Sequence, residues 1–256
     1  MGFFFDFFKG VTMGDYARDI SVCPIEGGLF LVSACDSCGG IGEKELDEVN
    51  VPAALVGKLT VRVALMELIS VGAAPKLMTV SLSTEPNPTG KEILKGIEGE
   101  LNSIGLNQLP RTISSEKNIK TRQTALGIGV TGICQKDELR VDRSLPGDYV
   151  YCLGKPKVGM EITSTEDPEM TTLKHVTELS AVSNIHDILP IGSQGIEKEL
   201  QQLISRRGFR LTDMTHNLDL QKSAGPASCL IFSSPDKYPR LNNDLPLSCL
   251  GRFYSS

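Results

Sequence analysis

The chain has 256 residues, 40% of them apolar and 22% charged, a composition typical of a globular protein rather than a disordered one. Its 31 acidic and 26 basic residues give a net charge of -5, which argues against a general nucleic-acid binder, because such proteins carry a basic excess. No stretch approaches the roughly 18–20 apolar residues that a membrane helix needs. We therefore expect neither nucleic acid nor membrane among the partners. The length corresponds to one large domain or two small ones.

The N-terminal segment is unusual because five of the nine Phe residues lie within residues 1–9. Asp6 interrupts this run, and neither a basic n-region nor a small-residue cleavage site accompanies it, so we reject a signal peptide. Two interpretations stay open: an apolar arm that packs on a partner or a neighbouring domain, or a lid over a ligand. The seven Cys residues lack scaffold spacing and indicate free thiols in a reducing compartment, so we expect a cytoplasmic protein.

Cys35 and Cys38 form a C-x-x-C motif, which can bind metal or exchange disulfides. No second pair and no nearby His accompany it, which argues against a zinc site. The pair also follows a predicted strand and enters a Gly-rich loop, whereas a redox pair is expected near a helix N-terminus. We therefore expect neither use.

The first predicted elements form a hairpin, with strands at 20–25 and 29–34 joined by Glu26-Gly27-Gly28. Asp36 then falls at the expected end of the second strand. The loop at 39–44 is rich in glycine, which lets a backbone approach a ligand closely and offer N–H groups to phosphate.

A long helix is predicted over 52–71, with Gly57 as a candidate break and Gly72 as its stop. Its second half is apolar nearly all round, which is typical of a buried helix. Arg62 and Glu67 are thus charges on a buried element. They lie about 140° apart around a helix of 3.6 residues per turn, so they do not pair with each other. Glu67 needs another cation, either a distant Arg or Lys or a metal ion.

The remaining elements follow from apolar periodicity and from Gly and Pro stops. Strands are expected at 77–82, 108–113, 124–134, 149–153 and 229–233, and helices at 88–104, 171–182 and 195–206. The strand expected at 124–134 contains a literal G-x-G-x-x-G over 127–132. We discount it as a dinucleotide fingerprint because its glycines lie inside the strand pattern instead of opening a helix. The charged link before Gly147 suggests a domain boundary, which we place between 143 and 144.

Five acids stand where an element meets a loop or inside the buried helix: Asp15, Asp19, Asp36, Glu67 and Glu116. Carboxylate oxygens are the hard ligands that Mg²⁺ prefers, and one or two suffice when phosphate oxygens complete the shell. Periodicity does not show that the five side chains lie at one place. Each one taken alone is typical of a solvated surface residue.

The order of the motifs resembles the PurM-like superfamily, which includes aminoimidazole ribonucleotide synthetase, thiamine-monophosphate kinase, selenophosphate synthetase and hydrogenase maturation factor E. The resemblance rests on Gly14-Asp15, Ser33 to Ser37, Ala64 to Ala73, Ser114-Ser115-Glu116, the glycines of 127–132, and the run from Pro146 to Gly154.

The resemblance implies an α+β, PurM-like two-domain fold. An N-terminal ATP- and Mg²⁺-binding domain (1–143), a mixed sheet with helices, would form a shared barrel in a homodimer. A shortened C-terminal α/β domain (144–256) would follow. The implied magnesium ligands are Asp15, Asp36, Glu67 and Glu116, and the resemblance reverses the preference at Glu67 in favour of magnesium.

This chain departs from the family pattern at four residues in three of these motifs. Cys35 replaces a Thr, Glu67 replaces an Asp, and Ser114 and Ser115 replace glycines. Lys44 and Arg62 are the implied phosphate partners.

The implied function is an ATP- and Mg²⁺-dependent kinase for a small molecule. The segment 39–47 together with 114–124 looks most like the α-ribazole kinase group, so α-ribazole, a nucleoside used in cobamide biosynthesis, is the expected substrate. Two alternatives remain: an ATP-dependent cyclo-ligase and a non-catalytic nucleotide-binding relative. Selenophosphate synthetase is disfavoured because Cys23 lies in a predicted strand. Asp187 beside His186 is a candidate general base, with a structural His as the alternative.

Overall fold

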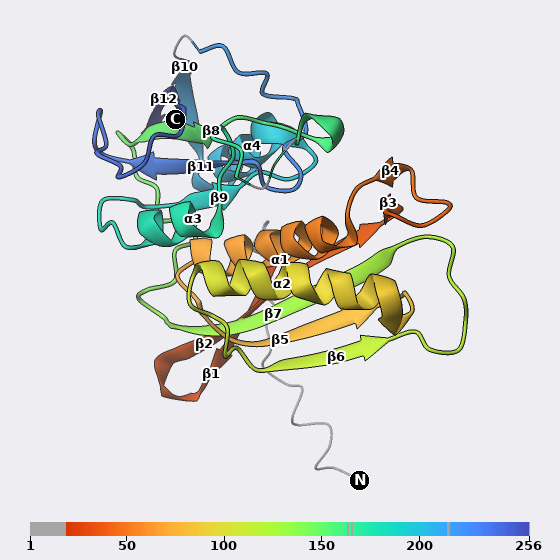
Figure 1. Cartoon of the computed structure of the whole chain (residues 1–256). Coiled ribbons are helices and arrows are strands. Elements are labelled where there is room, and N and C mark those ends of the chain that lie inside the picture. Colours follow the sequence, from red (N-terminus) through yellow and green to blue (C-terminus); the bar gives the residue numbers. More distant parts are fainter. Residues whose placement is uncertain (1–18, 163, 165, 214–215, 256) are drawn as a thin grey trace.

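The computed structural model describes residues 19–162, 164, 166–213 and 216–255, which form two five-stranded sheets (Figure 1). The first sheet uses strands between residues 20 and 135, and the second uses strands between 149 and 255. The domain division expected at 143/144 falls between the two.

The first sheet has the order β1-β2-β7-β5-β6, and only its β5–β6 pair is parallel. Its strands are β1 (Ile20–Ile25), β2 (Leu29–Gly39), β5 (Ala74–Leu82), β6 (Arg111–Ser115) and β7 (Ala125–Gln135). The central β2 and β7 pair along their whole length, from Leu29↔Gln135 to Gly39↔Ala125. The glycines of the literal G-x-G-x-x-G therefore lie inside β7, as the strand pattern predicts.

Strand β2 is longer than predicted, and this changes the position of Asp36. The expected end at residue 34 was wrong, because pairing with β7 continues to Gly39. Asp36 lies inside the strand, and the alternation of a strand places it on the same face as the buried Val32 and Ala34. That face is the one covered by helices.

Two helices cover this face, α1 (Ala53–Ser70) and α2 (Lys91–Ser103) (Figure 1). The expected break near Gly57 was wrong, because α1 runs through that residue. A Cβ at Gly57 would lie 2.1 Å from the carbonyl oxygen of Ile93, and one at Gly96 would lie 1.8 Å from that of Ala54. The two glycines thus allow α1 and α2 to approach closely.

Short elements connect these layers. The parallel strands β3 (Ile41–Gly42) and β4 (Val49–Asn50) precede α1. A π-helical turn, Pro86–Gly90, leads into α2, and short 3₁₀ helices lie at Glu26–Gly28 and Gly159–Glu161.

The second sheet is antiparallel, with the order β10-β12-β8-β11-β9. Its strands are β8 (Tyr149–Gly154), β9 (Ile188–Pro190), β10 (Phe209–Asp213), β11 (Cys229–Ser234) and β12 (Leu247–Ser255). Helix α3 (Leu173–Ser180) packs against α1. Helix α4 (Gly195–Arg207) packs on the other face of the second sheet, where its apolar side chains join a second apolar core. One apolar core includes residues of both halves, so α1 and its surroundings form the junction between them.

The outer face of the first sheet carries Leu31 and Leu77, which are 39% and 42% exposed. No helix of the described part of the chain covers this face (Figure 1). Within the same ranges, no helix combines the length and apolar character needed to cross a membrane.

Candidate functional site

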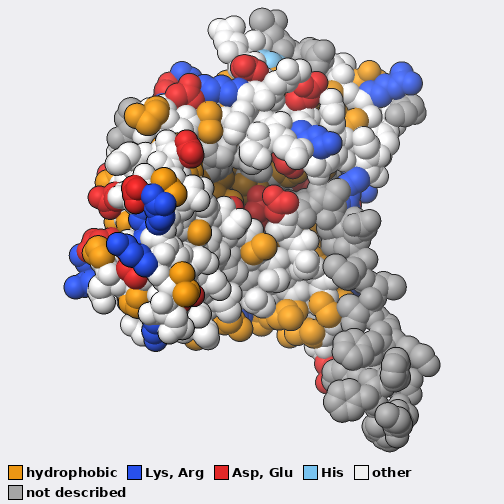
Figure 2. All heavy atoms as spheres, turned by 90° about the vertical axis from the view of Figure 1, so that its right-hand side faces the viewer, with side chains coloured by type: hydrophobic (Ala, Val, Ile, Leu, Met, Phe, Trp, Pro, Cys, Tyr) orange, Lys and Arg blue, Asp and Glu red, His pale blue; other side chains and the backbone are white. Residues whose placement is uncertain are grey.

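A pocket with a volume of about 570 Å³ lies beside α1, at the junction of the two halves. We call it the apolar pocket, because aliphatic side chains of β3, β4 and α1 supply most of its first-half wall. These side chains are Ile41, Val49, Val51, Leu55, Val56, Leu59 and Val63. Segments around residues 158–162 and 223–227 of the second half complete it. The side of the molecule shown in Figure 2 is hollowed near its centre, with hydrophobic side chains in the hollow and acidic ones at its edge.

Three carboxylates line the apolar pocket, and they come from different elements. Asp36 projects from β2, Glu67 from the last turns of α1, and Asp19 directly precedes β1. Burial raises the pKa of Asp36 to about 6, and the negative charge of Asp19 adds to this rise, while a hydrogen bond from the Ser37 N–H opposes it. Glu67 is only 8% exposed. Three carboxylates therefore share one pocket with a largely aliphatic set of side chains from the first half.

A second pocket of about 400 Å³ shares Asp19, Glu67 and Gly192 with the first. We call it the polar pocket. Helix α4 supplies Lys198, Glu199 and Gln202 to its wall.

The three carboxylates suit a magnesium ion shared with phosphate. Within the described residues, no group of three or more Asp, Glu, His or Cys side chains is arranged to hold a metal ion by itself. Magnesium bound through nucleotide phosphates needs only one or two protein carboxylates and keeps waters in its remaining positions. The donor set fits that arrangement better than an all-protein cage.

Lys44 does not line the apolar pocket. Its ammonium group donates to Glu85 and to the carbonyl oxygen of Thr121, the latter at 2.9 Å. Its backbone N–H donates to Asp47, and the Gly40 N–H donates to Thr124. The Gly-rich loop thus uses these backbone groups to fix its own shape.

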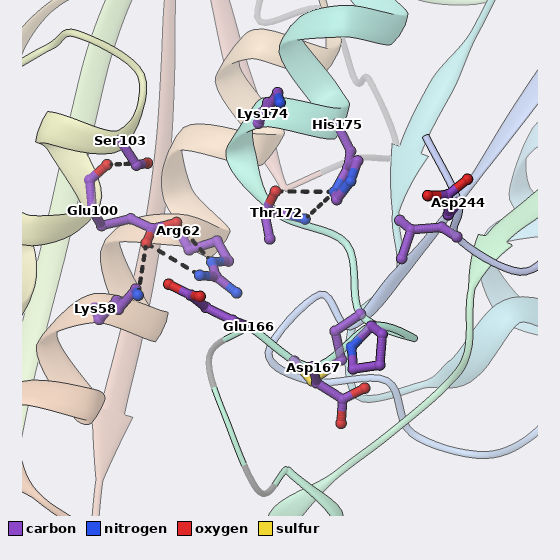
Figure 3. Close-up of a pocket in the computed structure, with 13 residues that line it drawn as sticks. Lys58, Arg62, Glu100, Ser103, Glu166, Asp167, Thr172, Lys174, His175 and Asp244 are labelled. Carbon is purple, nitrogen blue, oxygen red and sulfur yellow. Dashed lines mark hydrogen bonds and ion pairs between the residues drawn. The ribbon is translucent and has the colours of Figure 1, made fainter. Parts of the chain in front are cut away.

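Arg62 projects from the opposite side of α1, into a third pocket of about 420 Å³ that we call the charged pocket (Figure 3). Its Nε and Nη2 donate to the two carboxylate oxygens of Glu100 on α2, at 2.7 and 3.1 Å. Arg62 is 2% and Glu100 1% exposed. The Lys58 ammonium lies 3.9 Å from the same carboxylate. The expectation that Arg62 and Glu67 do not pair with each other agrees with this geometry.

Glu116 follows β6 and closes a turn. Its Oε1 accepts the backbone N–H groups of Asn118 and Ile119, at 2.7 and 3.0 Å, and these bonds hold the pKa of the carboxyl below its usual range. Glu116 is not among the described residues that line the three pockets. Asp15, the fourth expected ligand, lies outside the described residues, as does the Phe-rich segment.

Cys35 and Cys38 do not face each other. An offset of three residues in a strand puts two side chains on opposite faces, and both cysteines lie inside β2. Cys38 lines the apolar pocket, where burial and the nearby Asp36 charge raise its pKa to about 11. Its thiol is therefore protonated and poorly nucleophilic at neutral pH.

Asp187 and His186 take part in a buried network instead of lining either the apolar or the polar pocket. The Asp187 carboxylate accepts the N–H and hydroxyl of Ser144, at 2.7 and 2.6 Å. His186 pairs with Asp148 through Nδ1 at 2.7 Å. This favours the structural alternative for His186.

Asp47 is a residue that sequence reasoning missed. Its carboxylate accepts the backbone N–H and the hydroxyl of Thr124, each at 2.7 Å, and the Lys44 N–H at 2.8 Å. These bonds attach the 40–50 segment, which carries part of the apolar pocket's wall, to the start of β7. The only signal in the sequence was an Asp near a Gly-rich loop.

Comparison with known proteins shows similarity in fold. No protein-family model matches the chain, and no curated protein matches its sequence. The thiamine monophosphate kinase ThiL of Aquifex aeolicus matches with a TM-score of 0.66 at 16% identity, over 93% of this chain and 89% of that one. HypE of a HypE–HypF complex matches at 0.65 and 14% identity, over 100% and 94%. A ThiL protein complexed with AMPPCP and TMP matches at 0.62 and 14% identity, over 93% and 85%.

These likenesses confirm the PurM-like fold that the order of motifs led us to expect. At these identities they show the fold alone.

Proposed function

We propose that the chain binds ATP with Mg²⁺ at the apolar pocket and transfers the γ-phosphoryl group to a hydroxyl of a small molecule. The observation that carries this proposal is that Asp19, Asp36 and Glu67 line one pocket together with many aliphatic side chains. Aliphatic walls suit a nucleobase, and the acidic end suits a magnesium ion on the phosphates. The ThiL protein complexed with AMPPCP has the same fold, which supports a nucleotide triphosphate as the ligand.

Asp36 and Glu67 are the proposed magnesium ligands, with Asp19 beside them, and Asp15 stays a prediction. Bound magnesium would neutralise charge on the phosphates, and the protein would hold donor and acceptor in line. Deprotonated Asp36 would hold the ion in place. For Lys44, Arg62 and Glu116 we now favour supporting roles, since Glu85, Glu100 and backbone N–H groups already engage them.

α-Ribazole remains our best specific substrate, on the resemblance of 39–47 and 114–124 to the α-ribazole kinase group. The cyclo-ligase and the non-catalytic relative are the two alternatives. The fold shared with thiamine monophosphate kinase and the acids at the pocket support kinase activity, which is our preferred alternative.

A homodimer is part of the proposal. The uncovered outer face of the first sheet, with Leu31 and Leu77 exposed, would pair with its copy in a shared barrel. Analytical ultracentrifugation of the Leu31→Lys/Leu77→Lys double variant tests this. We expect monomer from the variant and dimer from the unaltered chain, and a monomeric unaltered chain would remove the dimer from the proposal.

Calorimetry with ATP, in the presence and absence of Mg²⁺, tests the core of the proposed function. We expect binding that depends on Mg²⁺, and no binding would overturn both enzyme hypotheses. ADP release with α-ribazole and other nucleosides, followed by mass spectrometry of the product, then separates the alternatives. A product heavier by one phosphoryl group supports the kinase, a dehydrated product supports the cyclo-ligase, and binding without turnover supports the non-catalytic relative.

A further inference from the structure

The apolar and polar pockets meet at the proposed phosphoryl-transfer centre. Asp19, Glu67 and Gly192 line both of them, whereas Asp36 lines the apolar pocket. Ligands in the two pockets therefore meet at Asp19 and Glu67. Two adjoining chambers at a magnesium-binding group suit in-line transfer, since donor and acceptor must both reach one phosphorus atom.

The two chambers differ in the ligand chemistry they suit. Aliphatic side chains line much of the apolar pocket, whereas the polar pocket presents Lys198, Glu199 and Gln202 from successive turns of α4. Gln202 offers both an amide donor and an amide acceptor. Such groups fix hydroxyls and ring nitrogens, so the polar pocket suits the acceptor and the apolar pocket suits the nucleotide base.

The charge of the polar pocket disfavours an acceptor that already carries phosphate. Among its described wall residues, Asp19, Glu67 and Glu199 are acidic and Lys198 is the one cation. If magnesium engages Asp19 and Glu67, Lys198 and Glu199 balance each other, and the described wall residues then carry no surplus positive charge. A phosphate group on the acceptor would normally need such a surplus.

The N-terminus of helix α4 does not supply the positive charge that a phosphate group on the acceptor would need. The Gly195 N–H donates to the Gly192 carbonyl oxygen at 3.4 Å, and the Glu197 N–H donates to that of Leu220 at 2.9 Å. Glu197 also places a negative charge in the first turn. These backbone groups are therefore committed within the protein, and the first turn repels an anion.

The geometry points to the polar pocket as the acceptor subsite, and to an acceptor that is a phosphate-free alcohol, uncharged or cationic. This inference rests on the proposed function. In the step it describes, the acceptor hydroxyl oxygen forms a bond to the γ-phosphorus of ATP. The bond from that phosphorus to the β,γ-bridging oxygen breaks, its electron pair leaves with ADP, and the hydroxyl proton passes to solvent.

The first test compares alcohols with their own monophosphates. ADP release is measured with Mg²⁺–ATP and α-ribazole, thiamine, cytidine or ribose, each paired with its monophosphate. We expect turnover of at least one phosphate-free member and at least about a hundredfold less with its monophosphate. Equal or faster turnover of a monophosphate overturns the inference, and so does the absence of turnover by every phosphate-free member. Absent Mg²⁺–ATP binding in calorimetry is a separate result, which overturns the proposed function itself.

The second test locates the subsite by a matched pair of variants on α4. Gln202 lines the polar pocket, whereas its neighbour Gln201 is exposed and lies outside the described pocket wall. Gln202→Leu should raise the KM of the best phosphate-free acceptor about tenfold or more while the Kd of Mg²⁺–ATP stays within twofold. Gln201→Leu should change neither. An unchanged KM in Gln202→Leu, or an equal rise in Gln201→Leu, removes the acceptor from this pocket.

Discussion

The buried charged side chains on the two sides of α1 have different surroundings. On the side of the charged pocket, Arg62 and Glu100 form a bidentate pair, with Lys58 close to the same carboxylate. On the side of the apolar pocket, Asp19, Asp36 and Glu67 line one pocket, and the pKa of Asp36 is raised to about 6 chiefly by burial and further by the Asp19 charge. One helix thus separates a bidentate charge pair from a pocket lined by three carboxylates, of which Asp19 and Asp36 repel each other.

This difference distinguishes a scaffold from a site. A buried ion pair keeps its geometry without help from outside, because each charge already has its partner. Like charges held near each other raise one another's free energy, and a cation lowers it. The first side should therefore determine stability, and the second should determine ligand binding. Each of the following variants tests whether stability and ligand binding depend on different sides of α1.

The largest effect is expected from Glu100→Gln. It leaves the buried Arg62 guanidinium without its carboxylate, which should lower the free energy of unfolding by about 3–5 kcal/mol. Chemical denaturation measures this, and Glu98→Gln on the same helix is the control. Glu98 is largely exposed and pairs with Arg111, so that variant should lose less than about 1 kcal/mol. Equal losses in both variants would contradict the scaffold role of the Arg62–Glu100 pair.

Asp36→Asn should weaken ligand binding without lowering stability. It removes a proposed magnesium ligand, so Mg²⁺–ATP affinity should fall about a hundredfold, or about 2.7 kcal/mol, in calorimetry. Thermal unfolding at pH 8 without ligand should show stability equal to or above that of the unaltered chain, since a buried charge is removed. Asp137→Asn, at an exposed position, should alter neither quantity. Retained affinity in Asp36→Asn would place the metal elsewhere.

The pH dependence of Mg²⁺ binding should follow Asp36. Since its pKa is raised to about 6, the protonated form competes with the metal below that pH, and affinity should fall about tenfold between pH 7 and pH 5. Without ligand, the stability of the folded state depends on pH in the opposite direction. The protonated carboxyl favours the folded state, and this contribution is complete below about pH 3.8 and is lost as the pH rises through about 6. Asp36→Asn should abolish most of both dependences, and an unaltered pH profile in that variant would assign them to another group.

A smaller effect is expected from Lys44→Met. The ammonium group joins the 40–50 segment to Glu85 and Thr121, so its loss should cost about 2 kcal/mol of stability. If Lys44 supports the pocket wall without touching phosphate, the Kd of Mg²⁺–ATP should change less than about threefold. Lys95→Met, at an exposed lysine, is the matched control. A hundredfold loss of ATP affinity would restore Lys44 to the role of phosphate partner.

The sequence predicted the fold well where periodicity was strong. Helices α2 and α4 and strands β1, β7 and β8 begin and end within a few residues of the expected positions. Strands β9, β10 and β12 were missed. β9 has only three residues, and β12 contains Gly251 and an irregular register beside Cys249, which obscure alternation. Their strand character depends on partners distant in the sequence.

The chemistry of the candidate site was predictable from the sequence, whereas the residues that form it were less so. The order of acidic motifs led to Asp36 and Glu67, which do line one pocket. Asp19 was named among the acids but not chosen, since the Gly14-Asp15 pair matched the family pattern and directed the choice to Asp15. The partners of Arg62 and Lys44 lie 38 and 41 residues away along the chain, so no local pattern revealed that these cations are engaged. The division into domains at 143/144 stays a prediction.

The central claim is that a divalent ion binds at the carboxylates that line the apolar pocket. The most direct measurement is anomalous diffraction from crystals grown with Mn²⁺ and AMPPCP. Our account predicts a manganese peak within coordination distance, about 2.2 Å, of carboxylate oxygens of Asp36 or Glu67, with the nucleotide phosphates on the same ion. A peak beside the Arg62–Glu100 pair or at Glu116, with none near Asp36 and Glu67, would contradict it.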